Sequence, residues 1–271
     1  MMNRTFIKIS LLVVLFLLAC GYGINLFQTI SYNRRVLATN IYDYIPHDAD
    51  YVVNFSRNHH FEEYFVLDST NSFIINAINE NITYPLLIIK KKSEENLLLC
   101  RVTKEQEKQI KTIIENQIAP YHLPTKRKED NRNIYFYSLP QNKFMVALLQ
   151  DGVLAISLDY LQIEDFIHSD RSIPNIFIQE NAQSNYFIQK TYESSPISFF
   201  INYDSTLYAL SYSLIKENIN IEGKYFGKQC ADSIPISYNK INQLLKLDHH
   251  HTDSVIWEND CFLKIKINKT E

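Results

Sequence analysis

Histidines and carboxylates gather near the C-terminus, where they could ligate a metal ion. His249, His250 and His251 are consecutive, and they lie between Asp248 and Asp253. Neutral imidazoles and carboxylates suit zinc, copper or nickel. Consecutive side chains cannot all face one ion in a regular backbone, and protonated histidines are also favourable beside the last carbonyls of a helix. We therefore expect a solvated loop after a helix, with a metal site as the alternative.

A second group lies where we expect a helix to begin. His59 and Glu63 are four residues apart and would share one face of that helix, as helical metal ligands do. His60 and Glu62 lie beside them, but their order does not give the His-Glu-x-x-His motif of zinc proteases. We expect local surface pairing, with a metal-assisted hydrolase that uses this group or the C-terminal histidines as the alternative.

A serine and a lysine at acyl-enzyme spacing form the third candidate. Ser237 and Lys240 have the Ser-x-x-Lys spacing of penicillin-binding enzymes, in which a lysine helps to remove the serine proton. The companion Lys-Thr-Gly strand is missing, and the same spacing recurs at Ser213 and Lys216. Ser237 is therefore more simply a helix N-cap.

The supply of glycine excludes several common chemistries. Only Gly152, Gly223 and Gly227 follow residue 27. Phosphate loops, dinucleotide fingerprints and nucleophile elbows need glycines at fixed offsets, for positive φ and for close backbone approach. No complete catalytic set can be written, so we expect no cofactor and favour a binding role over an enzyme.

Charge and composition indicate a folded domain that does not bind nucleic acid. The formal net charge is −3, and hydrophobic residues make up 46% of the chain. The dense basic runs, residues 90–92 and 126–128, each lie beside acidic residues, as in solvated loops.

The elements that carry these residues follow an N-terminal apolar run. Arg4 and Lys8 precede residues 9–27, a stretch close to the ~20 residues that cross a bilayer. A basic start before an apolar run is read by the export machinery. We therefore expect a membrane anchor and an extracytoplasmic outer domain, periplasmic if the source is a Gram-negative bacterium.

Within that run, Leu17-Leu18-Ala19-Cys20 resembles the lipobox of bacterial lipoproteins. The resemblance implies cleavage before Cys20 and lipidation of its thiol. Apolar residues continue to Phe27, however, whereas a mature lipoprotein normally continues into a polar tether. We favour an uncleaved transmembrane helix, with a lipoprotein or a cleaved soluble form as alternatives.

Three further cysteines carry no metal or redox motif. Cys100, Cys230 and Cys261 share no Cys-x-x-Cys spacing. Outside the cytoplasm Cys230 and Cys261 could form a disulfide, since Cys100 ends an apolar run and belongs in the core. Three separate buried thiols are the simpler interpretation.

Hydrophobic periodicity predicts an α+β fold, a largely antiparallel sheet with packed helices. Thr103 is the predicted N-cap of the best helix, which ends before Pro120. Residues 121–132 are predicted to be a charged loop. We expect strands at 49–55, 85–89, 96–102, 134–139, 144–149, 153–158 and 219–226, with one or two closing strands within 255–267. Helices are expected at 58–67, 103–119, 160–168 and 238–247.

One pattern recurs along the chain. Residues 50–56, 152–157 and 196–202 are apolar strands followed by a polar cap and a predicted helix, which in the third unit contains Leu207, Leu210 and Leu214. The pattern indicates either a duplicated binding scaffold or the chance recurrence of a common unit, and chance is the simpler explanation.

The layout also resembles a group of anchored envelope proteins of Gram-negative bacteria. The resemblance is carried by Ile45-Pro46, by the strand end Asn54-Phe55-Ser56, and by Gly152-Val153-Leu154-Ala155-Ile156-Ser157 before a helix. It spans about residues 1–215 and implies a membrane-anchored domain. No activity is assigned to that group, so the resemblance transfers no site residue.

Aromatic residues on the predicted strands are the last candidates. Most such residues belong to cores, but alternation along residues 134–137 should leave some tyrosines outward, as in contact surfaces. The candidates are Tyr51, Phe55, Tyr64, Phe65, Tyr135, Phe136, Tyr137, Phe199 and Phe200.

These patterns divide the chain into four parts. Residues 1–27 are a signal anchor or lipoprotein signal, 28–44 a stalk, 45–170 an α+β domain, and 171–271 a second α+β part that shares its core. We expect non-enzymatic binding of a protein or envelope component. The alternatives are the metal-assisted hydrolase and a lipid- or glycan-binding module with an enclosed aromatic pocket.

Overall fold

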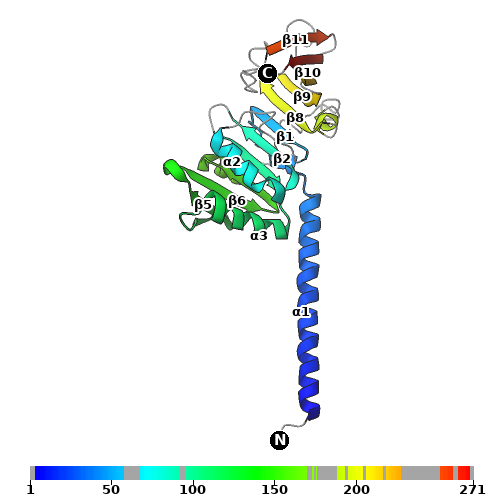
Figure 1. Ribbon diagram of the computed structural model, residues 1–271, viewed down its shortest axis with the longest axis vertical. Helices are drawn as coiled ribbons and strands as arrows, with labels where there is room; N and C mark the ends of the chain where they lie inside the picture. The colour runs from blue at the N-terminus through cyan, green and yellow to red at the C-terminus, as the bar shows by residue number, and fades with distance from the viewer. Residues whose placement is uncertain are drawn as a thin grey trace.

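The N-terminal helix stands apart from the rest of the molecule as a long rod (Figure 1). The computed structural model describes residues 4–57, 68–91, 95–169, 173, 175, 188–192, 195–203, 206–215, 218–226, 251–258 and 262–268, the last two segments by their backbone alone. Helix α1 (Arg4–Ala38) has a mean hydropathy of 2.2 over its most apolar window, none of which is buried. By length and composition it can cross a membrane.

A single antiparallel sheet forms the body of the protein, as the sequence predicts. Within the described part of the chain it has twelve strands, in the order β11-β12-β10-β9-β8-β1-β2-β3-β7-β6-β5-β4. Strand β8 pairs with β1, so the strands of both halves of the chain belong to one sheet. The strands are β1 (Tyr51–Phe55), β2 (Thr83–Lys90), β3 (Leu97–Arg101), β4 (Thr125–Glu129), β5 (Arg132–Ser138), β6 (Phe144–Gln150), β7 (Val153–Ser157), β8 (Ile197–Tyr203), β9 (Thr206–Ile215), β10 (Asn218–Phe226), β11 (His251–Glu258) and β12 (Phe262–Asn268).

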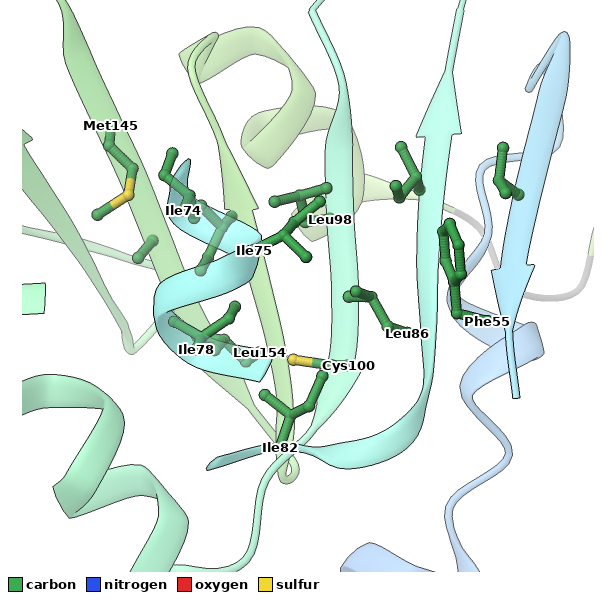
Figure 2. Close-up of a cluster of buried hydrophobic side chains, with 14 of the residues drawn as sticks. Phe55, Ile74, Ile75, Ile78, Ile82, Leu86, Leu98, Cys100, Met145 and Leu154 are labelled. Atoms are coloured by element: carbon green, nitrogen blue, oxygen red, sulfur yellow. The ribbon is translucent and has the colours of Figure 1, made fainter. Parts of the chain in front are cut away.

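One face of the sheet is covered by α2 (Ser69–Ile78) and α3 (Lys104–Ile113), which continues as a π-helical turn, η4 (Ile114–Ile118). In Figure 2, Ile74, Ile75 and Ile78 of α2 lie over side chains of the central strands, among them Leu98 and Cys100. All five are buried, so α2 is held by its apolar stripe.

The opposite face is covered by a second layer. Helix α4 (Tyr160–His168) and the short helix η1 (Ile41–Tyr44) pack there, and Ile41, Tyr44 and Phe166 are buried. Because both faces are covered, the central strands are apolar on both sides, and Leu97 and Leu98 of β3 are equally buried.

Local capping explains where the helices begin. Thr103 forms a capping box with Gln106, which confirms it as the predicted cap of α3. Asp68 caps α2 and Asp159 caps α4 through backbone N–H groups of their first turns. The sequence-based prediction found α3 and α4 and missed α2.

Two predictions for the chain's secondary structure are wrong. The charged loop predicted for residues 121–132 contains β4, which pairs with β5; its side chains are largely exposed, so it carries no apolar alternation. The predicted helix with Leu207, Leu210 and Leu214 is strand β9. There Leu207 and Leu210 enter opposite cores, so apolar residues on both faces imitate a helical spacing.

The recurring strand–helix pattern is therefore not a threefold repeat. Its third unit is a strand followed by a strand, since β8 pairs with β9. Its second unit is confirmed as β7 followed by α4. The helices predicted at 58–67 and 238–247 lie outside the described residues.

Substitution Thr103→Ala tests the capping of α3. We expect a loss of about 1 kcal/mol in the free energy of unfolding, because the N-cap bond to the Gln106 amide disappears. Thr112→Ala on the same helix is the control, since its hydroxyl only donates back to the Lys108 carbonyl. Equal losses in thermal unfolding of the two variants would contradict the capping role.

Candidate functional site

The end of α1 docks on the domain at a turn of the sheet. Val36 is only 1% exposed, and a Cβ placed on Gly152, between β6 and β7, would overlap its side chain. Gly152 also has φ of +78°, a conformation that other residues adopt only under strain. Glycine at this turn is what allows α1 to approach so closely.

Arg101, at the end of β3, binds the exit of α1. Its Nη1 donates to the carbonyls of Leu37 at 3.0 Å and Thr39 at 3.4 Å, and its Nη2 donates to the Tyr84 carbonyl at 2.6 Å. Burial lowers the pKa of Arg101, but a guanidinium stays charged in proteins. The last carbonyls of a helix have no partner within it and carry partial negative charge, so a cation is favourable here.

A second contact joins α1 to the start of α3. The Lys104 backbone N–H donates to Asn33 Oδ1 at 2.9 Å, and the Lys104 ammonium lies 5.5 Å from the centre of the Tyr32 ring. A lysine over an aromatic face is a cation–π contact. We call these contacts, with those of Val36 and Arg101, the anchor junction.

A buried polar network extends the junction into the sheet. Tyr42 of η1 donates to Asn54 Oδ1 at 3.1 Å, and Asn54 Nδ2 donates to Ser198 Oγ at 3.1 Å. Asn175 Nδ2 donates to the carbonyls of Tyr42 and Ile45. Asn54 and Ser198 are fully buried, so their bonds fix η1 against β1 and β8.

A groove with exposed aromatic rims lies away from the junction, on the α2 side of the sheet. It has a volume of about 340 Å³ and lies between α2, the end of η4 and the short helix η5 (Pro140–Asn142). Phe73 is 52% exposed and Tyr121 71% exposed, and both line it beside Lys143. Exposed aromatic side chains around a hollow are typical of protein contact surfaces.

A smaller cavity lies under α3, where Tyr135 and Tyr137 face Ile110 and Ile114. Its volume is about 140 Å³. Small-molecule pockets usually exceed about 300 Å³. This cavity is therefore smaller than the pockets that usually hold small molecules, and the lipid- or glycan-binding alternative stays a prediction.

Carboxylates and a histidine converge where the β4–β5 hairpin meets α4. Ligand atoms of Glu129, Glu164 and His168 lie within 4.8 Å of one another, so the three could hold a cation. Both oxygens of Glu129 already have partners, because Tyr160 donates to Oε2 at 2.7 Å and His168 Nε2 lies 3.2 Å from Oε1. The arrangement is best explained as a polar lock between hairpin and helix.

The lock changes the acidity of its central group. The hydroxyl of Tyr160, and after it His168, hold the pKa of Glu129 below its usual range. Arg127, whose Nη2 lies 3.7 Å from Glu129 Oε2, acts in the same direction and would oppose a bound cation.

Most of the sequence-predicted ligands lie outside the described residues. These are His59, His60, Glu63, His249 and His250. His251 is the first residue of β11, of which the structure describes only the backbone. Both metal groups, and the hydrolase that depends on them, stay predictions.

Of the four cysteines, two are described. Cys20 is exposed on α1, and its lipidation stays a prediction. Cys100 is buried as predicted, and burial raises the pKa of its thiol, which makes it a poor nucleophile. Cys230 and Cys261, with their possible disulfide, lie outside the described residues, as do Ser237 and Lys240.

The aromatic candidates that the structure describes are buried or half-buried. Phe55, Phe199 and Phe200 are buried. Tyr135 and Phe136 are half-buried on opposite faces of β5, and Tyr137 is buried. The prediction that tyrosines of this strand point outward is therefore wrong, because α3 covers their face and the α4 layer covers the face of Phe136. Tyr51 is also half-buried, and Tyr64 and Phe65 lie outside the described residues.

Sequence reasoning missed the candidate site residues that the structure brings together. Glu164 and His168 are four apart on one helix, and that spacing was a usable signal. Arg101 and Gly152 gave no comparable signal, because their partners on α1 are distant in the sequence. Leu37 is 64 residues from Arg101, and Val36 is still further from Gly152.

Substitution Arg101→Gln tests the anchor junction. We expect trypsin to cut after Arg34 and Arg35 at least tenfold faster, because losing charged hydrogen bonds worth about 2 kcal/mol lets the end of α1 open locally. Arg132→Gln is the control, since the hydrogen bond of Arg132 goes to the Ile167 carbonyl of α4. Equal cleavage rates in the two variants would show that Arg101 does not hold the helix.

The lock predicts a pH-dependent effect of Glu129→Gln. A carboxyl whose folded pKa is depressed stabilises the protein above its unfolded pKa of about 4.3, and that contribution disappears as the pH falls through the folded value. We therefore expect the variant to melt below the wild type at about pH 6.5 and together with it at about pH 3. Glu95→Gln, at an exposed site, is the control, and its melting temperature should follow that of the wild type at both pH values. A melting-temperature difference between Glu129→Gln and the wild type that stays constant with pH would refute the lock.

Comparisons of the chain with family models, with curated proteins and with solved structures found no match. The function must therefore be inferred from the anchor junction, the groove and the lock themselves.

Proposed function

We propose that this chain is a membrane-anchored protein whose outer domain binds a protein or another envelope component. The observation that carries the proposal is the docking of an apolar, exposed helix onto the central strands through the anchor junction. A cleaved export signal has no need of such contacts at its far end. The proposed anchor is residues 9–27, as an uncleaved helix.

The junction would hold the domain at a fixed distance from the membrane surface. Between residue 27 and the end of α1 at Ala38 the helix rises by roughly 16 Å, at 1.5 Å per residue. Because Val36 and Arg101 fix this end to the sheet, the rod and the domain would move as one body. A rigid connection between helix and domain would limit the orientations in which the domain meets a neighbouring protein in the same membrane.

The groove beside Phe73 and Tyr121 is the surface that best suits a protein partner. Both rings are more than half exposed, although the strands behind them bury their own aromatics. Aromatic side chains supply much contact area at little conformational entropy, and they are enriched at interfaces. Lys143 at the rim adds a charge that can orient a partner.

The proposed orientation puts the domain outside the cytoplasm. Arg4 and Lys8 lie before the apolar run, and basic residues favour the cytoplasmic side. Arg34 and Arg35 lie on the other side of the run, so the charge bias is small. The basic start followed by an apolar run, as in export signals, also supports an extracytoplasmic domain.

Photo-crosslinking in intact cells tests the binding role. A benzophenone amino acid in place of Tyr121 should yield one dominant adduct of the full-length protein, identified by mass spectrometry. The same probe at Leu161, an exposed apolar residue on α4, is the matched control and should not yield it. Identical adducts from both positions, or none from position 121, would reject the groove as the contact surface, and an adduct of the chain with itself would make the partner a second copy.

A further inference from the structure

A crevice lies between α1 and the beginning of α3, next to the apolar run. Its volume is about 370 Å³, and its lining includes Phe27, Gln28, Tyr32, Arg35 and Lys104. It is separate from the aromatic groove and from the polar lock, which share none of these residues.

The chemistry of the crevice is that of an anion site. Arg35 and Lys104 bring two cations to it, and none of the described residues that line it is acidic. Glu107 lies outside the lining and pairs with the Lys104 ammonium at 3.2 Å, which offsets one charge. The Lys104 side chain is still 56% exposed, so it is open to a further anion. Guanidinium and ammonium groups together suit phosphate oxygens.

The position of the crevice selects the kind of anion. Phe27 ends the apolar run, and Arg35 follows two turns later, about 12 Å along the helix. The headgroup layer of a bilayer is roughly 5–8 Å thick on each side. If residues 9–27 fill the hydrocarbon, lipid phosphates lie between the levels of Phe27 and Arg35, which is the span of the crevice.

We propose that this crevice binds the phosphate of an anionic lipid headgroup, an inference that rests on the proposed membrane anchoring. The hydrocarbon chains of the lipid would lie along α1 below Phe27, and its phosphate would accept hydrogen bonds from Arg35 and Lys104. Occupation would add a bridge between α1 and α3 to the one that Lys104 already makes to Tyr32 and Asn33.

Native mass spectrometry of the full-length protein tests the proposal. The protein is purified in detergent doped equally with phosphatidylglycerol and phosphatidylcholine of the same chain length. We expect at least about tenfold preference for the anionic lipid. The double variant R35Q/K104Q should lose that preference, whereas the charge-matched control K108Q/K111Q, with two exposed lysines of α3 outside the crevice, should keep it.

Equal retention of the two lipids by the wild type would overturn the proposal, and so would a preference for the anionic lipid that survives in R35Q/K104Q. Displacement of the lipid by millimolar inorganic phosphate would also overturn it, because free phosphate would then be the ligand. The double variant loses the Lys104 ammonium over Tyr32, and trypsin cleavage after Arg34 checks that the Val36 and Arg101 contacts of the junction still hold the end of α1. Carbonate extraction of cells separates the two hypotheses. If the wild type stays in the membrane but shows no lipid preference, only the proposed lipid site in the crevice is refuted. If the wild type is extracted, the proposed membrane anchoring is refuted as well.

Discussion

The carbonyl groups at the end of α1 impose the constraint on which the arrangement of the molecule depends. A helix leaves its last carbonyls without partners inside the helix. In this protein Thr39 donates to the carbonyls of Arg35 and Val36, and Arg101 donates to that of Leu37 from β3, a strand with neighbours on both sides. The same guanidinium also binds the Tyr84 carbonyl of β2. Helix and sheet are thus joined through one side chain at the centre of the fold, and the close contact of Val36 with Gly152 completes the attachment.

The other features follow from that attachment. Since α1 is fixed beside the β6–β7 turn, the start of α3 must lie against it, and the crevice lined by Arg35 and Lys104 exists only because the two helices are held there. The aromatic groove lies on α2 and η4 instead, so a bound neighbour and a bound lipid would not compete for one surface. The α4 layer is tied to the sheet independently, by the lock around Glu129 and by Lys91, whose ammonium contacts Asp165 at 2.5 Å.

Local signals were sufficient for part of the fold and for little of the site. The Thr103 cap, the apolar stripe of α3 and the short turns between β5, β6 and β7 are encoded within a few residues, and those elements were predicted. Strand β9 was not, because two covered faces remove the alternation that identifies a strand. The anchor junction was out of reach in principle: Arg101 is an ordinary strand residue until the fold brings the end of α1 to it. Neither could the sequence show that Glu129 would lie opposite Glu164 and His168.

The proposed membrane anchoring gives the position of strand β4 a consequence. Among the described strands it is the outermost on its side of the sheet, and one row of its backbone donors and acceptors faces none of the others. Such edges invite pairing with another chain and lead to aggregation. Anchored proteins share a thin layer, so collisions between copies are frequent. Lys126, Arg127 and Lys128 are exposed along this edge, and a second copy approaching it edge-on would meet its own positive charges. We therefore expect the basic run to oppose edge-to-edge pairing between neighbouring copies.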